Sequence, residues 1–437
     1  MNLDGSMEAN PALNDKKVIR AWALFDWANS AYSLVISTAI FPIYFLAVAP
    51  DKINILGASL SDSSVYSYSI SLAYILIALM APMLGGIADA GSKRLSFLKL
   101  FTTIGSIACM VLFFFSSEIL VWLGTSAFII STVGFAGSLI FYDAFLPSIA
   151  TRDQYDIVSA KGYAYGYVGS VLLLVTILFI SLKPTLFGIP ADSALPYRIG
   201  FLLVGIWWIG WSQYTFKYLP QDKKRTLHKP LLKDGYREIK SVFNELKHKP
   251  NLRAFLASFF FYSAGVNTVI YLATVFAEKE LGFESSELIL TVLILQLVAI
   301  IGALLFARVS KIRGSKYALV VMIIIWMAIC FAAYFISSKP WFFVLAFFVG
   351  MVLGGIQSSS RASYTKLIEN ETEYNSYFSF YDLLFYLSIV FGTAVFAILD
   401  NITNNLRYGV LSLALFFVVA LFIFRNVKID PEELSPV

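Results

Sequence analysis

Long runs of hydrophobic residues recur along the whole chain, separated by short polar segments. Each run approaches the roughly 20 residues that a helix needs to cross a hydrocarbon core about 30 Å thick. Because lipid offers the backbone no hydrogen-bond partners, we expect helices; barrel strands would be shorter and alternating. The pattern predicts twelve crossings, at 20–48, 65–88, 97–116, 120–142, 161–183, 199–217, 253–276, 286–306, 317–336, 340–360, 376–399 and 405–425.

The composition favours a multi-pass membrane protein. Hydrophobic residues make up 58% of the 437 residues, more than a water-soluble domain of this size can bury. The first 19 residues are polar and lack the apolar core of a signal peptide. We therefore expect the first crossing to serve as its own insertion signal.

Basic residues are distributed unevenly between the two predicted sides of the membrane. With a cytoplasmic N-terminus, the inner segments hold all but six of the 33 Lys and Arg residues. The positive-inside rule then places both termini in the cytoplasm. The net charge of +5 follows from this asymmetry and indicates no nucleic-acid partner. The six outer residues are Lys52, Lys183, Arg198, Lys279, Lys339 and Arg407.

The longest inner connection divides the crossings into two groups of six whose sequences echo each other. The segments Gly85 to Lys93 and Gly302 to Lys316 both begin with a glycine at a helix end and finish with Gly-Ser-Lys, and Asp143 and Arg361 end corresponding helices. Such echoes are typical of a duplicated transporter. We predict an all-α polytopic protein with a tail at 1–19, an N-terminal six-helix bundle at 20–217, a basic linker at 218–252, a pseudo-symmetric C-terminal bundle at 253–427, and a tail at 428–437.

The linker contains a pattern typical of an amphipathic helix between Pro230 and Pro250. Such a helix could lie on the anionic inner leaflet, and the alternative is a plain solvated tether. The apolar positions are Tyr236, Ile239, Phe243 and Leu246, with Arg237, Lys240 and Lys247 on other faces.

Polar residues inside the crossings are expected to face a cavity or a partner, because lipid rejects them. They form stripes on three predicted helices, which could line a water-filled pathway or bond neighbouring helices. The pathway candidates in the first and seventh crossings are Asp26, Asn29, Ser33, Asn267 and Tyr271. Tyr163 and Tyr167, beside a glycine ladder in the fifth crossing, could stack on a ligand or act as interfacial anchors.

Asp382 is the candidate proton-binding carboxylate of the eleventh crossing. It is expected about 12 Å along that helix, deep enough to need a partner or a proton. The alternative is a permanently ionised partner of an Arg or of helix-terminal dipoles. Asp143 and Arg361 could form a salt bridge that closes an inner gate, or could be two independent interfacial charges.

The sequence indicates neither a metal site nor a cofactor. Cys109 and Cys330 lie in different apolar runs, where buried packing is expected, and His228 and His248 share one basic loop. There is no phosphate-binding Gly-rich Lys loop, so ATP is not the expected energy source.

The segment from Gly85 to Arg94 resembles the inter-helix signature of the major facilitator superfamily. Gly85, Asp89, Lys93 and Arg94 match, whereas Ser92 stands where a glycine is usual. The resemblance implies that Asp89 holds the two bundles together on the inner side by contacting the start of helix 11. Lys93 and Arg94 would support it.

A second resemblance is more specific. Trp22 to Tyr32, Phe141 to Pro147, Ser159 to Tyr167 and Gly354 to Arg361 resemble the vacuole-effluxer-like (autophagy-related) family of major facilitators, which has many bacterial members. This chain departs from it at Ala264, where an aspartate is common, and at Asp143, where asparagine is usual. Fungal vacuolar members are associated with amino-acid efflux.

These patterns predict a secondary transporter that moves a small polar or zwitterionic solute by alternating access. Coupling to protons is expected, and simple facilitated exit is the alternative. We expect a monomer in the lipid bilayer of a bacterial cytoplasmic membrane, with no cofactor. A membrane-embedded enzyme would need a catalytic constellation that the sequence does not contain. A transport-inactive sensor or scaffold, the remaining alternative, would normally carry a larger soluble domain.

Overall fold

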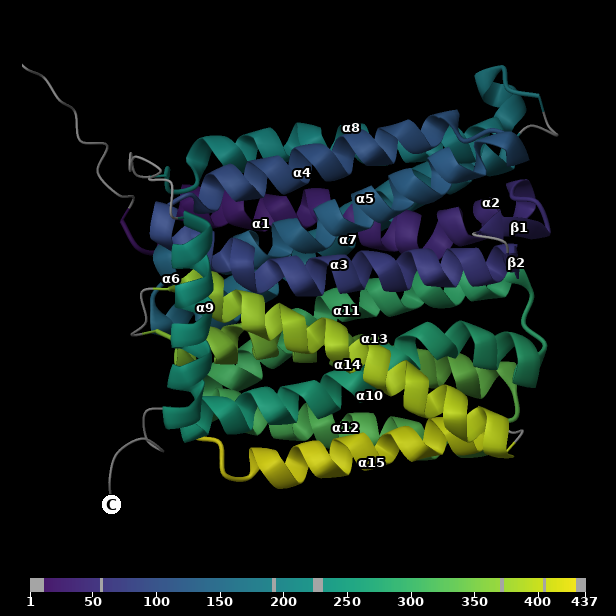
Figure 1. Cartoon of the computed structure of the whole chain (residues 1–437). Helices are drawn as coiled ribbons and strands as arrows, with labels where there is room; N and C mark the ends of the chain where they lie inside the picture. The colour runs from purple at the N-terminus through teal and green to yellow at the C-terminus, as the bar shows by residue number, and fades with distance from the viewer. Residues whose placement is uncertain are drawn as a thin grey trace, which may run out of the picture.

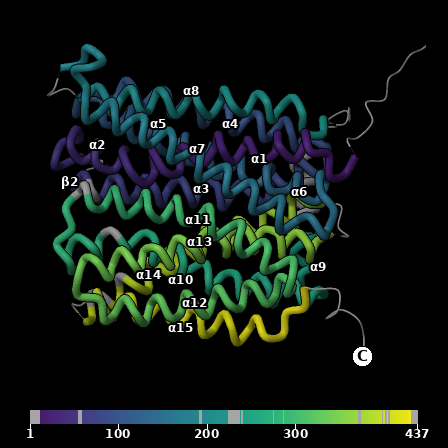
Figure 2. The backbone as a smooth tube through the Cα atoms, turned by 180° about the vertical axis from the view of Figure 1, so that it is seen from behind, coloured from purple at the N-terminus to yellow at the C-terminus, as the bar shows by residue number. Residues whose placement is uncertain are grey.

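The chain folds into two halves, each made of long, nearly parallel helices (Figures 1 and 2). One half comes from the N-terminal part of the sequence and the other from the C-terminal part. The computed structural model describes residues 12–55, 58–190, 194–222, 231–369, 373–403 and 406–429. The N-terminal half contains α1 (Lys16–Ala31), the π-helix η1 (Tyr32–Ile40), α2 (Phe41–Val48), β1 (Lys52–Ile55), β2 (Ala58–Ser61), α3 (Asp62–Gly91), α4 (Arg94–Val111), η2 (Leu112–Phe114), η3 (Glu118–Leu120), α5 (Val121–Asp143), α6 (Leu146–Ile149), η4 (Arg152–Gln154), α7 (Tyr155–Leu182), η5 (Pro184–Phe187) and α8 (Leu195–Tyr218).

A short helix separates this half from the second. It is α9 (Leu231–His248), which lies across one end of the molecule, nearly perpendicular to the other helices (Figure 1). This end is called the α9 end below, and α1 starts and α15 ends there. The C-terminal half contains α10 (Pro250–Leu281), α11 (Ser285–Arg313), α12 (Ser315–Phe335), α13 (Lys339–Leu367), α14 (Tyr374–Thr403) and α15 (Leu406–Phe424).

The predicted polytopic all-α fold is confirmed. In the described part of the chain, eleven helical segments are long and apolar enough to cross a membrane. The one predicted crossing not among these eleven is the sixth, 199–217, and it corresponds to α8, which has 24 residues and runs beside α4 along the molecule (Figure 1). α8 falls outside the eleven because its sequence mixes tryptophan, tyrosine and charged residues with the aliphatic ones.

The first crossing is continuous but not uniform. Between α1 and α2 it widens into the nine-residue π-helix η1, where the Thr38 hydroxyl donates to the Ser33 carbonyl. The wide turns end just before Pro42, which has no backbone N–H to continue the α-helical ladder. A β-hairpin follows, pairing Lys52 with Ser61, and it was not predicted from the sequence.

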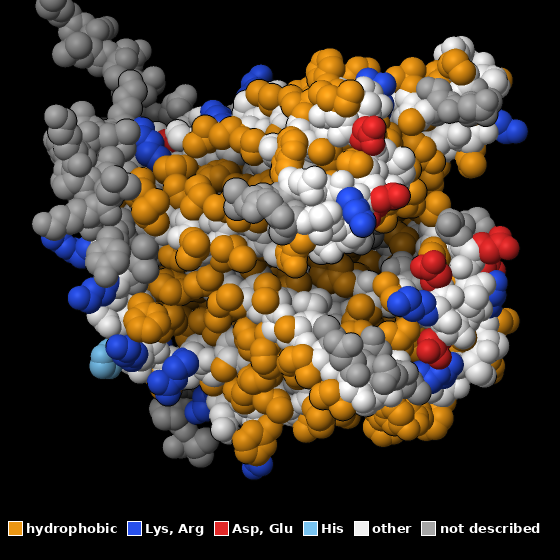
Figure 3. Space-filling model, turned by 45° about the vertical axis from the view of Figure 1, so that its right-hand side comes forward, with side chains coloured by type: hydrophobic (Ala, Val, Ile, Leu, Met, Phe, Trp, Pro, Cys, Tyr) orange, Lys and Arg blue, Asp and Glu red, His pale blue; other side chains and the backbone are white. Residues whose placement is uncertain are grey.

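The halves meet along two seams. One joins α3 to α14, and the other joins α7 to α11. At the second seam Ala160 of α7 packs against Ala303 and Ala307 of α11. Polar contacts between the halves concentrate toward the α9 end. Figure 3 brings the opposite end forward and shows a hollow between the halves, walled largely by hydrophobic side chains.

Glycines set the separation of helices within the C-terminal half. A Cβ atom on Gly350 of α13 would lie 2.7 Å from the Leu295 carbonyl oxygen of α11. A Cβ on Gly354 would meet the Ala299 carbonyl, whose carbon would be 2.8 Å away. Because both neighbours are backbone, they cannot move aside without shifting a whole helix.

We therefore expect Gly354→Ala to destabilise the protein by about 1–3 kcal/mol through overpacking. Gly210→Ala in α8 is the matched control, because its new methyl group would meet nothing within 4 Å. That control should raise stability by roughly 0.5–1 kcal/mol, since alanine favours helix over glycine. Thermal unfolding of both purified variants in detergent measures the difference, and equal midpoints would contradict the packing argument.

Candidate functional site

One arginine links the two halves through a buried charge cluster. Arg361 lies near the end of α13 and is only 1% exposed. Its Nη1 donates to Asp143 Oδ1 of α5 at 2.8 Å, and its Nη2 lies 3.3 Å from Asp26 Oδ2 of α1. Two carboxylates of the N-terminal half therefore hold one guanidinium of the C-terminal half.

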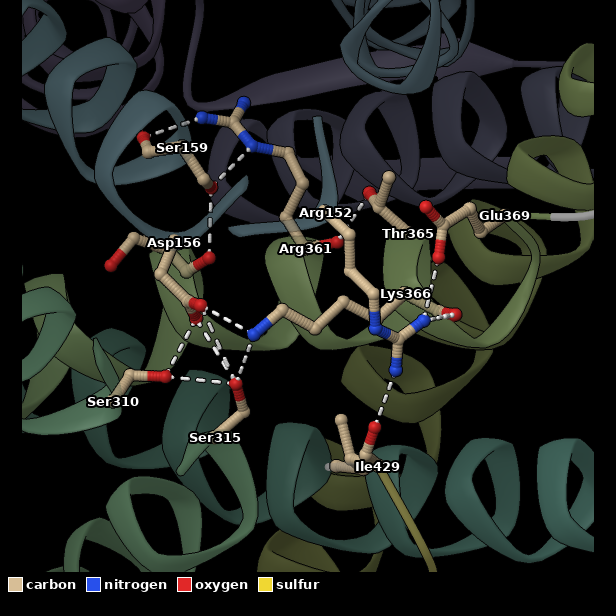
Figure 4. Close-up of polar contacts among 11 residues, drawn as sticks. Arg152, Asp156, Ser159, Ser310, Ser315, Arg361, Thr365, Lys366, Glu369 and Ile429 are labelled. Carbon is tan, nitrogen blue, oxygen red and sulfur yellow. Dashed lines mark hydrogen bonds and ion pairs between the residues drawn. The ribbon is translucent and has the colours of Figure 1, made fainter. Parts of the chain in front are cut away.

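The remaining donors of Arg361 are satisfied by α7. Its Nε donates to Ser159 Oγ and its Nη2 donates to the Ser159 carbonyl, both at 2.9 Å (Figure 4). The Tyr163 ring centre lies 4.3 Å and the Trp22 ring centre 4.7 Å from the guanidinium carbon. The Tyr142 hydroxyl donates to Asp26 Oδ2 at 2.7 Å. The cluster thus combines cation–π contacts with complete hydrogen bonding of a buried cation.

A missing side chain makes room for this cluster. A Cβ atom on Gly162 of α7 would lie 2.5 Å from Asp26 Oδ2 and 2.9 Å from Arg361 Nη2. One turn later, a Cβ on Gly166 would collide with Ser30. The glycine ladder of α7 therefore packs on the polar stripe of α1, and this close approach puts Asp26 within reach of Arg361.

Asp382 leaves the charges of the region unbalanced. It lies on α14, is 6% exposed, and its Oδ2 has no hydrogen-bond partner among the described residues. The charges of Asp143 and Arg361 both act on it. One turn further along α14, the Tyr386 hydroxyl donates to the Ala136 carbonyl of α5 at 3.4 Å. Three carboxylates thus share the region with one guanidinium.

Asp89 forms a separate clamp between the halves. At the end of α3, its Oδ2 accepts hydrogen bonds from the Ser376 N–H and hydroxyl, both at 2.8 Å. Its Oδ1 accepts from Asn375 Nδ2 at 2.6 Å and from the Asn375 N–H at 3.2 Å. Asp89 therefore caps the N-terminus of α14, where carboxylates are favourable. Arg94 adds a bond from its Nε to Asn375 Oδ1 at 3.1 Å.

The turn after Asp89 adopts glycine-like geometry without glycine. Ser92, which occupies the usual glycine position of the signature, has φ 51° and ψ 45°. This left-handed conformation satisfies the end of α3, because the Ser92 N–H donates to the carbonyls of Ala88 and Asp89. Lys93 contributes its own N–H to Ala88, but within the described chain its side chain forms no hydrogen bond or ion pair.

A third network joins the halves at the α7–α11 seam (Figure 4). Asp156, in the first turn of α7, binds Lys366 Nζ of α13 at 2.5 Å and the Ser310 hydroxyl of α11 at 2.7 Å. Nearby, Arg152 pairs with Glu369 at 2.7 Å and donates to the carbonyls of Lys366 and Ile429. Sequence reasoning missed this network because it treated these charges as parts of loops.

Other predicted pathway residues lie apart from the Arg361 cluster. Asn29 is buried and accepts from the Ser138 hydroxyl at 3.4 Å, while Asn267 donates to the Ser263 carbonyl of its own helix. Tyr167 donates to Gln357 Oε1 at 2.7 Å, which adds a contact between α7 and α13. Ser33 is half-buried, and Tyr271 is 47% exposed near Tyr74.

Solved structures with this fold are transporters of the major facilitator superfamily. A proton:xylose symporter, XylE, aligns with 94% of this chain and 95% of its own at a TM-score of 0.69 and 14% identity. A fucose transporter, FucP, in the outward conformation aligns at a TM-score of 0.66 with 13% identity, covering 94% and 97% of the two chains. The fold is therefore that of the major facilitator transporters.

Sequence comparison identifies the family within the major facilitators. The model of the vacuole effluxer Atg22-like family matches residues 14–432, and the chain belongs to this family. An uncharacterized MFS-type transporter of Bacillus subtilis, YxiO, is 30% identical over 95% of both chains. Autophagy-related protein 22 of Kluyveromyces lactis is 25% identical over 85% of this chain and 81% of its own length.

The strained turn yields one prediction. Ser92→Gly should stabilise the protein by about 1 kcal/mol, because glycine adopts the left-handed conformation without steric cost. Gly282→Ala is the converse control, with φ +64° and no atom within 4 Å of the new Cβ, and it should destabilise. Thermal unfolding in detergent measures both, and a lower midpoint for Ser92→Gly would refute the strain.

The cluster yields a second prediction. Arg361→Gln should destabilise by about 3–5 kcal/mol, because it leaves two buried carboxylates without a cation. Asp143→Asn should cost much less, since Asp26 still pairs with Arg361. A double variant that exchanges the two charges, Asp143→Arg with Arg361→Asp, should not recover the stability of the unmodified protein. The aspartate at 361 would face Asp26 and the Ser159 carbonyl. Unfolding of the three variants tests this, and recovery in the exchanged variant would show that Asp26 is not a partner.

Proposed function

We propose that this transporter moves a small polar or zwitterionic solute by alternating access, coupled to protons. The observation that carries the proposal is the Arg361 cluster, which holds α13 to α1, α5 and α7 through buried charges. In this role Asp89, Lys93, Arg94, Asp143 and Arg361 form the inner gate. The cluster must separate whenever the halves part at the α9 end.

We assign the α9 end to the cytoplasm. The positive-inside rule supports this, because the basic linker and both ends of the described chain lie there. The conformation is then closed on the cytoplasmic side and open outward, in keeping with the hollow of Figure 3 and with the outward conformation of FucP. Two clamps, at Asp89 and at Asp156, would open together with the Arg361 cluster.

Asp382 is the proposed proton site. Its Oδ2 is buried and has no hydrogen-bond partner in the described part of the chain, and an unpaired buried charge is costly. Proton binding removes that cost, and the neighbouring Asp143–Arg361 pair places the site beside the gate. Proton binding at Asp382 would therefore change the electrostatics of the contact that closes the cytoplasmic side.

The proposed solute path runs between the halves, from the Arg361 cluster toward the end opposite α9. Tyr163, Tyr167, Asn29, Ser33, Asn267 and Tyr271 would supply hydrogen bonds and ring faces along it. The printed name of the family, vacuole effluxer, supports efflux, and amino acids would fit a zwitterionic solute. The relationship to a Bacillus protein supports a bacterial cytoplasmic membrane, in which the chain would act as a monomer.

The solute is sought first by thermal-shift screening of purified protein against amino acids, peptides and metabolites. A hit is then tested for saturable uptake into proteoliposomes with and without a pH gradient. Saturable uptake supports transport. Its absence for every stabilising compound would favour a transport-inactive sensor or scaffold.

Asp382→Asn should abolish pH-driven accumulation while solute exchange continues, because the amide cannot take up and release a proton. Asp51→Asn, an exposed carboxylate at the end opposite α9, serves as the matched control. Radiolabelled solute in proteoliposomes measures both activities. Unchanged accumulation in Asp382→Asn would exclude this residue from coupling.

A further inference from the structure

The α9 helix uses one of its faces to hold the α3–α14 seam. Val242 is 1% exposed, and Leu246 packs against the hydrophobic core of the C-terminal half. Glu245 Oε2 accepts from the Tyr377 hydroxyl of α14 at 2.8 Å and from Lys249 Nζ at 3.2 Å. The hydrogen bond from Tyr377, and then the bond from Lys249, lower the pKa of Glu245. This face therefore fixes the helix on the protein.

A second face of α9 carries an exposed aromatic ring between two exposed lysines. Phe243 is 54% exposed although it is a large apolar side chain. Lys240 and Lys247 lie three residues before and four residues after it, one helical turn away on the same face. The expectation that these lysines lie on other faces than Phe243 was therefore wrong. Lys247 Nζ lies 5.2 Å from the centre of the Phe243 ring. No described side chain neutralises this pair of lysines as an ion-pair partner.

The position of the ring shows which way this face points. The Phe243 ring centre is 6.5 Å from that of Phe380, which lies inside the membrane-crossing helix α14. Phe243 therefore extends from α9 toward the apolar belt of the molecule. The two lysines lie beside this ring, and Figure 3 shows Lys and Arg side chains gathered at the α9 end.

We propose that Lys240, Phe243 and Lys247 form a docking site for the anionic phospholipids of the surrounding leaflet. The lysine ammonium groups bind headgroup phosphates, and the phenyl ring enters the boundary between headgroups and acyl chains. Charge complementarity favours binding of anionic over zwitterionic lipid. Each lysine contributes about 1 kcal/mol, which corresponds to a roughly fivefold preference per lysine. Lipid is the occupant because the ring points into a belt that the bilayer itself must cover.

This docking has a mechanical consequence. Tyr377, which Glu245 holds, directly follows the two residues that Asp89 binds at the start of α14. Lipid bound to one face of α9 therefore stabilises the closed seam held by the other face. The docking site itself includes no residue of the proposed solute path or proton site.

The test places a bimane fluorophore on Phe243→Cys in the full-length protein. Cys109 and Cys330 are both 0% exposed, so labelling is directed to position 243. The protein is reconstituted in nanodiscs of phosphatidylcholine alone or with phosphatidylglycerol, and quenching by shallow spin-labelled lipid is measured. We expect stronger quenching with phosphatidylglycerol, and Lys240→Gln with Lys247→Gln should remove most of that increase.

The matched control removes the same charge at the opposite end, through Lys52→Gln and Lys279→Gln, and it should keep the increase. Equal quenching in both lipids, or an increase that survives loss of Lys240 and Lys247, would overturn the proposal. A fluorophore open to aqueous iodide but not to lipid quenchers would show a solvated face. Shielding from both quenchers would indicate a protein partner instead.

Discussion

The structure depends on the cost of placing a guanidinium inside a membrane protein. Arg361 is nearly inaccessible to solvent, so its charge is tolerable only while carboxylates and hydrogen-bond acceptors surround it. Every one of those acceptors belongs to the other half of the molecule. Separating the halves thus exposes a charge that water must then solvate, which makes the contact suited to two alternative states rather than to a gradual movement.

The two clamps beside this cluster use similar acidic groups but bind them in different ways. At the α3–α14 seam the carboxylate of Asp89 follows a helix end and binds the N-terminus of a helix from the other half. At the α7–α11 seam the carboxylate of Asp156 lies in the first turn of α7 and binds a lysine and hydroxyl groups. Both seams therefore place an acidic group of the N-terminal half against donors of the C-terminal half.

Much of this architecture follows from hydrophobic runs alone, because a bilayer forces each run into a helix. Asp26 was recognisable because charges are rare within such runs, and Asp143 and Arg361 because they directly follow two corresponding runs. Asp156 and Lys366 were not, since α7 begins at Tyr155 and α13 continues to Leu367, beyond the apolar stretches that marked them. Spacing placed Asn267 on a pathway face, but it could not show that its side chain would bond to its own helix.

The contacts of Arg152 and Asp89 differ from ordinary ion pairs in what they demand of their partners. Arg152 binds the carbonyls of Lys366 and Ile429, and Asp89 binds the N–H groups of Asn375 and Ser376. Main-chain groups are supplied by almost any amino acid. Substitutions at the partner positions can therefore change the side chains while the main-chain bonds of each attachment stay intact, so evolution can remodel this surface without first losing its closure.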